Sequence, residues 1–315
     1  MIDKYQAVLL GFAIGDALAA PIEDVVLQEA TETGFVREYM KAFPSHPFSH
    51  LEPGQYSDET QMMMLVGQSI VASRGFSLND LVKRFIDWFQ SQRLRAMWRF
   101  PSNSVMKACR KLASGVPPTI SGSLSAGVAA TVRTVPLALA FWRTPALLKN
   151  SMEKSCRITH TDSRVVGAAM VLATAIKMGL EGSEPAVEVL VNQAIERAQI
   201  FSPDIGKRLN QMRMCLRLDP GPAMEQIGNS GFCMEAVPAA LYWFFRHPRR
   251  FNDMIIGAAN IGGDSDAIAA MAGAVFGAFN GLGSIPDRWF INLEGVADLK
   301  QLGCDLYRLA IPQHS

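Results

Sequence analysis

Charged residues are scarce in this 315-residue chain, and neither sign predominates. Only 19% of the residues are charged, with 30 Lys and Arg against 29 Asp and Glu, whereas 49% are hydrophobic. A net charge of +1 provides no field that would hold a phosphate backbone, so we expect no nucleic-acid binding. High hydrophobicity with low net charge also excludes disorder as the main state. We expect a soluble, compact globular protein.

Cysteine is also scarce, and the sequence lacks export and membrane signals. The five cysteines lie far apart, without a C-x-x-C pair or histidines at zinc-ligand spacing. This predicts reduced thiols in a cytoplasmic protein, not disulfides or a zinc ribbon. The N-terminus does not resemble a signal peptide. Apolar runs such as 236–245 are shorter than the roughly 18 residues that cross a bilayer, so no membrane association is expected.

The sequence lacks β-hairpin turn signals and a regular alternation of strands with helices. Helical signals are frequent instead. Ser77 and Asp80 have the spacing of a capping box, and apolar residues then recur at helical intervals. The same periodicity follows Thr60 and Pro185. These patterns predict an all-α fold, and the absence of repeats and of a long polar linker predicts a single domain over residues 1–315.

Irregular segments are expected where glycine, proline and serine gather, because these residues favour turns. None of these segments is long or polar enough to separate independent domains. They are residues 24–57, 100–126, 144–164, 201–206, 217–231 and 281–288.

Four clusters of polar residues stand out against the apolar background, at residues 11–23, 56–62, 158–163 and 258–267. In the first cluster, Asp16 lies among Gly, Ala, Ile and Leu. Its carboxylate must therefore be paired, since burial of an unpaired charge costs several kcal/mol. The third cluster contains a histidine that, taken alone, is more typical of a structural role than of a ligand.

The second and fourth clusters have both a structural and a functional interpretation. Ser-Asp-Glu-Thr before an apolar run is a good helix N-cap, and Gly-Gly-Asp-Ser-Asp suits a loop followed by a cap. Taken together, their oxygen atoms are the ligands that Mg²⁺ or Mn²⁺ prefers. Two such ions, about 4 Å apart, can orient water and polarise a substrate oxygen. The candidate ligands are Ser57, Asp58, Glu59, Asp264 and Asp266, with the hydroxyl of Ser265 in addition.

The order of the motifs resembles the ADP-ribosylglycohydrolase family. Five segments match the family's motifs in sequence, and five ordered motifs are far more specific than any one of them. The resemblance runs from Gly11 to about Trp289, which is most of the chain. The matching segments are residues 11–23, 57–62, 159–162, 231–241 and 258–274.

The resemblance implies an all-α bundle with a central cleft that holds two Mg²⁺ or Mn²⁺ ions. It implies hydrolysis of the bond between C1 of the distal ribose and an acceptor such as arginine or serine. A loop would bind the diphosphate through backbone N–H groups, and an aromatic side chain would lie beside adenine. By motif position the catalytic residues would be Glu23, Asp58 and Asp264, and the substrate contacts Ser121, Gly122, Ser123, Gly127, His160 and Phe232.

Two positions depart from the family pattern. Glu59 replaces the second Asp of the S/T-D-D-T segment, and Ala267 replaces a Thr that supplies a hydroxyl ligand. Because Mg²⁺ demands near-octahedral geometry, the lost hydroxyl must be replaced by water. The second metal site is therefore the weaker part of the implied ligand set.

We expect a metal-dependent hydrolase that removes ADP-ribose from a modified protein, with arginine as the first acceptor to consider, or from a small conjugate. Such an enzyme would reverse a toxin-derived or regulatory modification. The alternative is a non-catalytic ADP-ribose-binding or partner-blocking protein on the same scaffold, which the changes at Glu59 and Ala267 would favour. The cleft-rim loops that select the acceptor are expected at residues 24–56 and 100–120.

Overall fold

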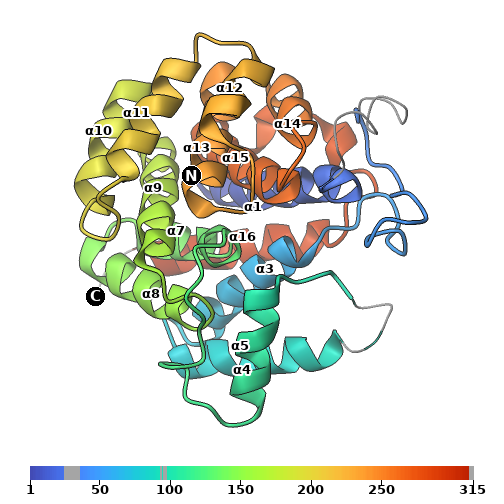
Figure 1. The fold of residues 1–315 in the computed structure, drawn as a ribbon, viewed down its shortest axis with the longest axis vertical. Coiled ribbons are helices and arrows are strands. Elements are labelled where there is room, and N and C mark those ends of the chain that lie inside the picture. Colours follow the sequence, from blue (N-terminus) through green and yellow to red (C-terminus); the bar gives the residue numbers. More distant parts are fainter. Residues whose placement is uncertain (25–35, 93, 95–97, 312–315) are drawn as a thin grey trace.

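The computed structural model describes residues 1–24, 36–92, 94 and 98–311, and this part of the chain is helical (Figure 1). It contains no β-strand, and its only bridges are isolated, between Ser123 and His160 and between Gly127 and Phe232. The prediction of an all-α fold is confirmed. The α-helices are α1 (Ile2–Ala19), α3 (Asp58–Ala72), α4 (Leu78–Ser91), α5 (Asn103–Ala113), α6 (Ala129–Val132), α7 (Val135–Phe141), α8 (Pro145–Arg157), α9 (Ser163–Leu180), α10 (Val187–Ala198), α11 (Ile205–Cys215), α12 (Pro220–Ile227), α13 (Cys233–Arg246), α14 (Phe251–Ala259), α15 (Ser265–Asn280) and α16 (Val296–Ala310), and short 3-10 helices lie at Ala20–Ile22, Leu282–Ser284 and Asp287–Phe290.

The centre of the fold is the pair formed by α1 and α15, which lie side by side in Figure 1. Small residues let the two backbones touch. A Cβ atom on Gly11 would lie 2.3 Å from the Gly273 carbonyl oxygen, and one on Gly15 would lie 2.2 Å from that of Ala269. Helices α14 and α16 pack on this pair, and α9 and α13 pack against α15. Both central helices are therefore buried along most of their length.

The helices expected from capping and periodicity are present. Ser77 is the N-cap of α4, and its Oγ accepts a hydrogen bond of 3.3 Å from the Asp80 N–H. Helix α3 begins at Asp58, and α10 follows Pro185.

Three segments expected to be irregular contain the helices α5, α8 and α12. Helices α8 and α12 each have a proline at their first position, where the fixed φ angle suits a helix start. Helix α5 follows Ser102, whose Oγ accepts the Val105 N–H at 3.5 Å. Proline and serine thus mark helix starts at these positions rather than loops.

Within the described residues, two helices are long and apolar enough to cross a membrane, over Ile2–Ile22 and Ser163–Leu180. Neither helix is an unbroken apolar run in the sequence, because single polar residues, such as Asp16, interrupt it. The apolar windows of these helices are 94% and 83% buried inside the protein. Both helices are part of the main hydrophobic core.

We predict that Gly15→Ala destabilises the protein, because the new methyl group would meet the backbone of α15 rather than a movable side chain. Overpacking of this kind costs about 1–3 kcal/mol, against a gain of at most about 1 kcal/mol from helix propensity. Urea denaturation should show a net loss of about 2 kcal/mol. Gly221→Ala in α12 is the control, because nothing lies within 4 Å of its Cβ position. Equal stabilities for the two variants would contradict the close packing of α1 on α15.

Candidate active site

The buried Asp16 carboxylate fixes the start of α3. It accepts hydrogen bonds from the backbone N–H groups of Ser57 and Thr60, both at 2.9 Å, and from the Thr60 hydroxyl at 2.6 Å. The expectation that this side chain is paired is therefore met by hydrogen bonds. Because Asp16 lies in the last turn of α1 and Asp58 begins α3, these bonds place the first acidic segment beside the end of α1.

A glycine turn presents the second acidic segment. Gly262 and Gly263 have φ angles of 71° and 60°, in the left-handed region that favours glycine. The Gly263 carbonyl accepts N–H groups from Asp24 at 3.0 Å and Ser265 at 2.9 Å, which ties the turn to the segment that follows Glu23. Helix α15 begins directly after this turn.

Glu23, Asp264 and Asp266 meet at the junction of these segments. One carboxylate oxygen of each residue lies within 4.8 Å of the others. Glu23 and Asp264 are half-buried, and Asp266 is buried. The sequence predicted Asp264 and Asp266 as metal ligands and placed Glu23 among the catalytic residues, whereas the structure groups all three.

A cavity of about 540 Å³ opens beside this group. Asp58 and Glu59, from the first turn of α3, also line it, so all five predicted acidic residues face one space. Its remaining lining is Trp98, Phe100, Pro101, Ser102, Asn103, Ser104, Met106, Arg110, Ser125, Gly127, Val128, Ala129, His160 and Gly231.

The five acidic residues of the cavity raise one another's pKa values. Burial raises the pKa of each of the five carboxyl groups, and repulsion between neighbouring carboxylates raises it further. The pKa of Asp264 rises to about 6, mainly through burial, although a hydrogen bond with Asp266 opposes the rise. None of the five forms an ion pair with a lysine or arginine in the described part of the chain.

These features fit a divalent cation. The donor atoms are all oxygens, which hard cations prefer. The buried Oε2 of Glu59 and Oγ of Ser265 have no hydrogen-bond partner among the described residues. A cation among Glu23, Asp264 and Asp266 would neutralise charges that the protein itself leaves unpaired. The acidic group can therefore bind a metal ion.

The remaining predicted ligand, Ser57, acts as the N-cap of α3. Its Oγ accepts the Glu59 N–H at 3.2 Å, and the residue is fully buried outside the cavity lining. On the opposite segment, the Ala267 N–H donates to Asp266 Oδ1 at 2.7 Å. The start of α3 is thus capped by a serine hydroxyl, and the start of α15 has a carboxylate in its first turn that accepts a backbone N–H, while both present acids to the cavity.

The predicted diphosphate loop has an inner and an outer side. Ser121 is fully buried and donates from Oγ to the Ile158 carbonyl at 2.7 Å. A Cβ on Gly122 would lie 2.6 Å from the Arg157 carbonyl, so the backbone packs closely there. Ser123 pairs through its backbone with Thr159 and Thr161. Within this loop, Ser125 and Gly127 reach the cavity.

Phe232 lies in a neighbouring cavity of about 480 Å³, not in the acidic one. The guanidinium carbons of Arg164 and Arg208 lie 5.1 and 5.9 Å from the centre of its ring. The preceding residue, Gly231, lines the acidic cavity, so two consecutive residues line the two cavities. The second cavity is lined by Arg164, Asp204, Lys207, Arg208, Gln211, Phe232 and Met234.

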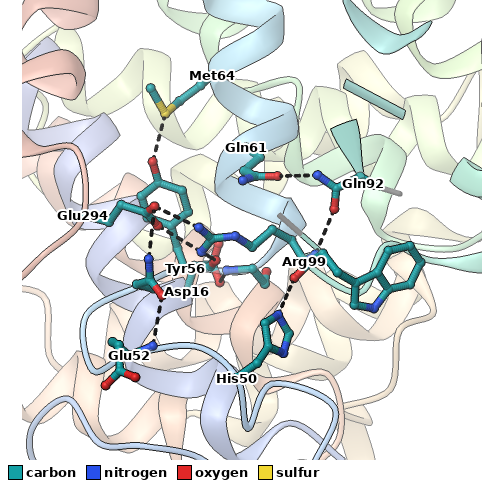
Figure 2. Close-up of polar contacts among 12 residues, drawn as sticks. Asp16, His50, Glu52, Tyr56, Gln61, Met64, Gln92, Arg99 and Glu294 are labelled. Atoms are coloured by element: carbon teal, nitrogen blue, oxygen red, sulfur yellow. Dashed lines mark hydrogen bonds and ion pairs between the residues drawn. The ribbon is translucent and has the colours of Figure 1, made fainter. Parts of the chain in front are cut away.

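An ion pair that the sequence analysis missed supports one rim of the acidic cavity (Figure 2). The buried Arg99 guanidinium donates to both carboxylate oxygens of Glu294, at 2.8 and 3.0 Å, and to the Tyr56 carbonyl at 2.8 Å. The Arg99 carbonyl in turn accepts the Asp58 N–H at 3.2 Å. Trp98 and Phe100, on either side, line the cavity. Nothing in the sequence marks this pair, because 195 residues separate its members.

Comparison with known proteins agrees with this architecture. A family model for ADP-ribosylglycohydrolases matches residues 1–315. The chain is 31% identical over 311 residues to an uncharacterized protein of Archaeoglobus fulgidus, covering 98% of this chain and 97% of that protein. It is 26% identical to ADP-ribosylhydrolase ARH3 of Danio rerio, covering 100% and 93% of the two chains.

Two further relatives extend the comparison. The chain is 25% identical to the ADP-ribosyl-(dinitrogen reductase) glycohydrolase of Rhodospirillum rubrum, covering 93% of this chain and 90% of that one. A solved structure titled ADP-ribosylglycohydrolase-related protein complex superposes with a TM-score of 0.75 at 27% identity, covering 98% and 99% of the chains. This protein belongs to the ADP-ribosylglycohydrolase family. It is therefore a glycosidic-bond hydrolase, and the resemblance inferred from the five motifs is confirmed.

We predict that Asp266→Asn stabilises the metal-free protein and removes its response to metal. The folded state raises the pKa of Asp266, so this group stabilises the fold at low pH and loses that contribution as the pH rises through its folded pKa. Metal-free Asp266→Asn should therefore melt above the wild type at pH 8. Added Mg²⁺ or Mn²⁺ should stabilise the wild type by about 2.7 kcal/mol at about 100 times Kd, but not the variant.

Differential scanning fluorimetry with EDTA or metal, at pH 5 and pH 8, measures both effects. Asp87→Asn removes an exposed acid of α4 and is the matched control, which should change neither quantity. A metal response in Asp266→Asn equal to that of the wild type would refute the proposed ligand group.

We predict that Glu294→Gln destabilises the protein by about 2 kcal/mol, because it leaves the Arg99 charge buried without a carboxylate partner. The control is Asp305→Asn, which breaks an ion pair with the exposed Arg308 and should cost no more than about 0.5 kcal/mol. Urea denaturation of the two variants side by side tests this difference. Similar losses would show that the Arg99 pair does not anchor the rim.

Proposed function

We propose that this enzyme removes ADP-ribose from a modified protein, in a reaction that depends on Mg²⁺ or Mn²⁺. The observation that carries the proposal is the meeting of Glu23, Asp264 and Asp266 within 4.8 Å in one acidic cavity. All-oxygen sites of this kind select hard divalent cations. A second ion, as predicted from the sequence, would bind more weakly, because Ala267 supplies no hydroxyl.

When bound, the cation would lower the pKa values of its carboxylate ligands and stabilise negative charge on oxygens of the substrate or water. Asp58 lies in the same cavity but outside the group of three, so we assign its carboxylate to accept the proton of the attacking water. The water oxygen bonds to ribose C1 as the C1–N bond breaks. The departing guanidine nitrogen then takes up the proton that Asp58 accepted from the water, which returns Asp58 to its carboxylate form.

Arginine is the acceptor we propose. A guanidinium is a planar cation, which an acidic cavity attracts and which stacks favourably on aromatic rings. Trp98 and Phe100 supply two rings at the cavity, 6.0 Å apart between their centres. The Rhodospirillum rubrum relative is named for its action on a modified protein, dinitrogen reductase, which supports a protein substrate here.

We propose that the substrate extends from the acidic cavity towards Phe232. The scissile ribose would lie at Glu23 and Asp264, and the adenosine end would reach the neighbouring cavity. The basic side chains of Arg164, Lys207 and Arg208 supply a positive field there that suits a nucleotide. Residues 25–35, part of the predicted rim, lie outside the described part of the chain.

We predict metal-dependent release of free ADP-ribose from an arginine-ADP-ribosylated protein, measured by mass spectrometry with Mg²⁺, Mn²⁺ or EDTA. Asp264→Asn should lower kcat at least 100-fold, because it removes a member of the carboxylate group, whereas Asp87→Asn should match the wild type. Circular dichroism should show that both variants fold.

Serine-linked and small ADP-ribose conjugates form the second arm of this assay. Release from these alone would replace arginine as the acceptor. Full activity in EDTA would refute the metal dependence. Tight binding of ADP-ribose without turnover of any conjugate would instead support the binding-protein alternative.

A further inference from the structure

The His160 side chain is tied to a buried hydrogen-bond chain behind the cavity. Its Nδ1 lies 2.7 Å from the Thr159 Oγ1, and the same hydroxyl oxygen lies 2.7 Å from NH2 of Arg133. Arg133 NH2 also donates to the Ser155 carbonyl at 2.9 Å. Arg133 and Thr159 are fully buried, and His160 is 1% exposed. The chain of contacts therefore lies inside the protein and ends at the cavity wall.

Arg133 is the first donor in this series of hydrogen bonds, and it fixes which group donates in each of them. A guanidinium only donates, so Thr159 Oγ1 must accept from Arg133. These two contacts are the only hydrogen bonds of the Thr159 hydroxyl among the described residues. If Nδ1 also donated to this oxygen, the hydroxyl proton would be buried without an acceptor, which is unfavourable. Thr159 therefore donates to Nδ1, and the ring proton is on Nε2.

Nε2 has no hydrogen-bond partner in the described part of the chain, and it lies over Gly127. A Cβ atom placed on Gly127 would come within 3.1 Å of Nε2. Both residues line the acidic cavity. Glycine thus leaves room for a ligand atom beside the Nε2–H group.

We propose that Arg133 and Thr159 are positioning residues that hold His160 as the neutral Nε2–H tautomer, so that His160 donates a hydrogen bond to an oxygen of the bound ADP-ribose unit over Gly127. The identity of the ligand rests on the proposed function, whereas the tautomer does not. His160 is then a fixed donor rather than a general acid or base.

The surroundings of the ring support a neutral histidine. Burial, with a smaller contribution from the charge of Arg133, lowers the pKa of His160 to about 3. Arg133 itself forms no ion pair within the described residues and stacks 5.2 Å from the centre of the Phe85 ring. A cation this close disfavours a second positive charge on the imidazole.

The tautomer can be read directly by NMR on protein labelled with ¹⁵N-histidine. Five histidines are present, and the His160 signals are those missing from His160→Gln. Nitrogen shifts and couplings to the ring protons distinguish a protonated from an unprotonated nitrogen. We expect protonated Nε2 and unprotonated Nδ1 in the wild type at neutral pH. A protonated Nδ1 would overturn the proposal.

Two substitutions of Thr159 separate its hydroxyl from its shape. Thr159→Val has the same shape but cannot donate, so it should yield mixed tautomers, whereas Thr159→Ser should restore the wild-type spectrum. In calorimetric titrations with ADP-ribose, Thr159→Val should weaken binding about tenfold and Thr159→Ser less than twofold. An unchanged spectrum in Thr159→Val would overturn the positioning role.

Gly127→Ala tests the donor end of the chain separately. The atoms nearest to its methyl group would belong to His160 and Ser125, with Nε2 the closest, so the tautomer should persist while the affinity for ADP-ribose falls about tenfold. Unchanged affinity in both Gly127→Ala and Thr159→Val would overturn the donor role. If the wild type bound no ADP-ribose, the proposed function and the donor role would fail together, while the NMR spectrum would still decide the tautomer.

Discussion

The hydrogen bonds to the buried Asp16 carboxylate are the constraint on which the site depends. Helix α1 contacts α15 through glycines along one side, and at its C-terminal end Asp16 holds the start of α3. Helix α3 begins with two of the acids and α15 begins among two others, while Glu23 follows the short 3-10 helix that continues from α1. One central helix therefore sets the relative positions of all five carboxylates, which come from three distant parts of the sequence.

This arrangement places like charges together in a buried space, which opposes folding. Part of the cost is offset by the helix N-termini, whose unpaired N–H groups and dipoles favour negative charge at the first turns of α3 and α15. Raised pKa values show that this compensation is incomplete. A divalent cation bound here would supply the remainder, so the affinity for the metal and the instability of the metal-free site would have the same origin.

The sequence predicted the features that depend on local chemistry. Helical periodicity, the cap at Ser77 and the need to pair Asp16 all follow from residues near one another, and the ordered motifs identified the acidic segments. The sequence did not reveal contacts between distant residues, such as Arg99 with Glu294. Arg133 could have been found, since a single arginine within the apolar run 128–142 needs buried partners for the same reason as Asp16.

The charge of Arg133 affects both the acidic residues of the cavity and the neutral histidine, His160, that lines it. No carboxylate of the described chain lies within ion-pair distance of this arginine. Burial lowers the pKa of Arg133 and the charges of Glu59 and Asp58 oppose that fall, while burial raises the pKa of Asp58 and the charge of Arg133 opposes that rise. The interaction therefore acts across space rather than through contact. This leaves the carboxylates free for a cation, while hydrogen bonds through Thr159 commit the guanidinium to orienting His160. A direct ion pair would have neutralised both groups and removed both functions.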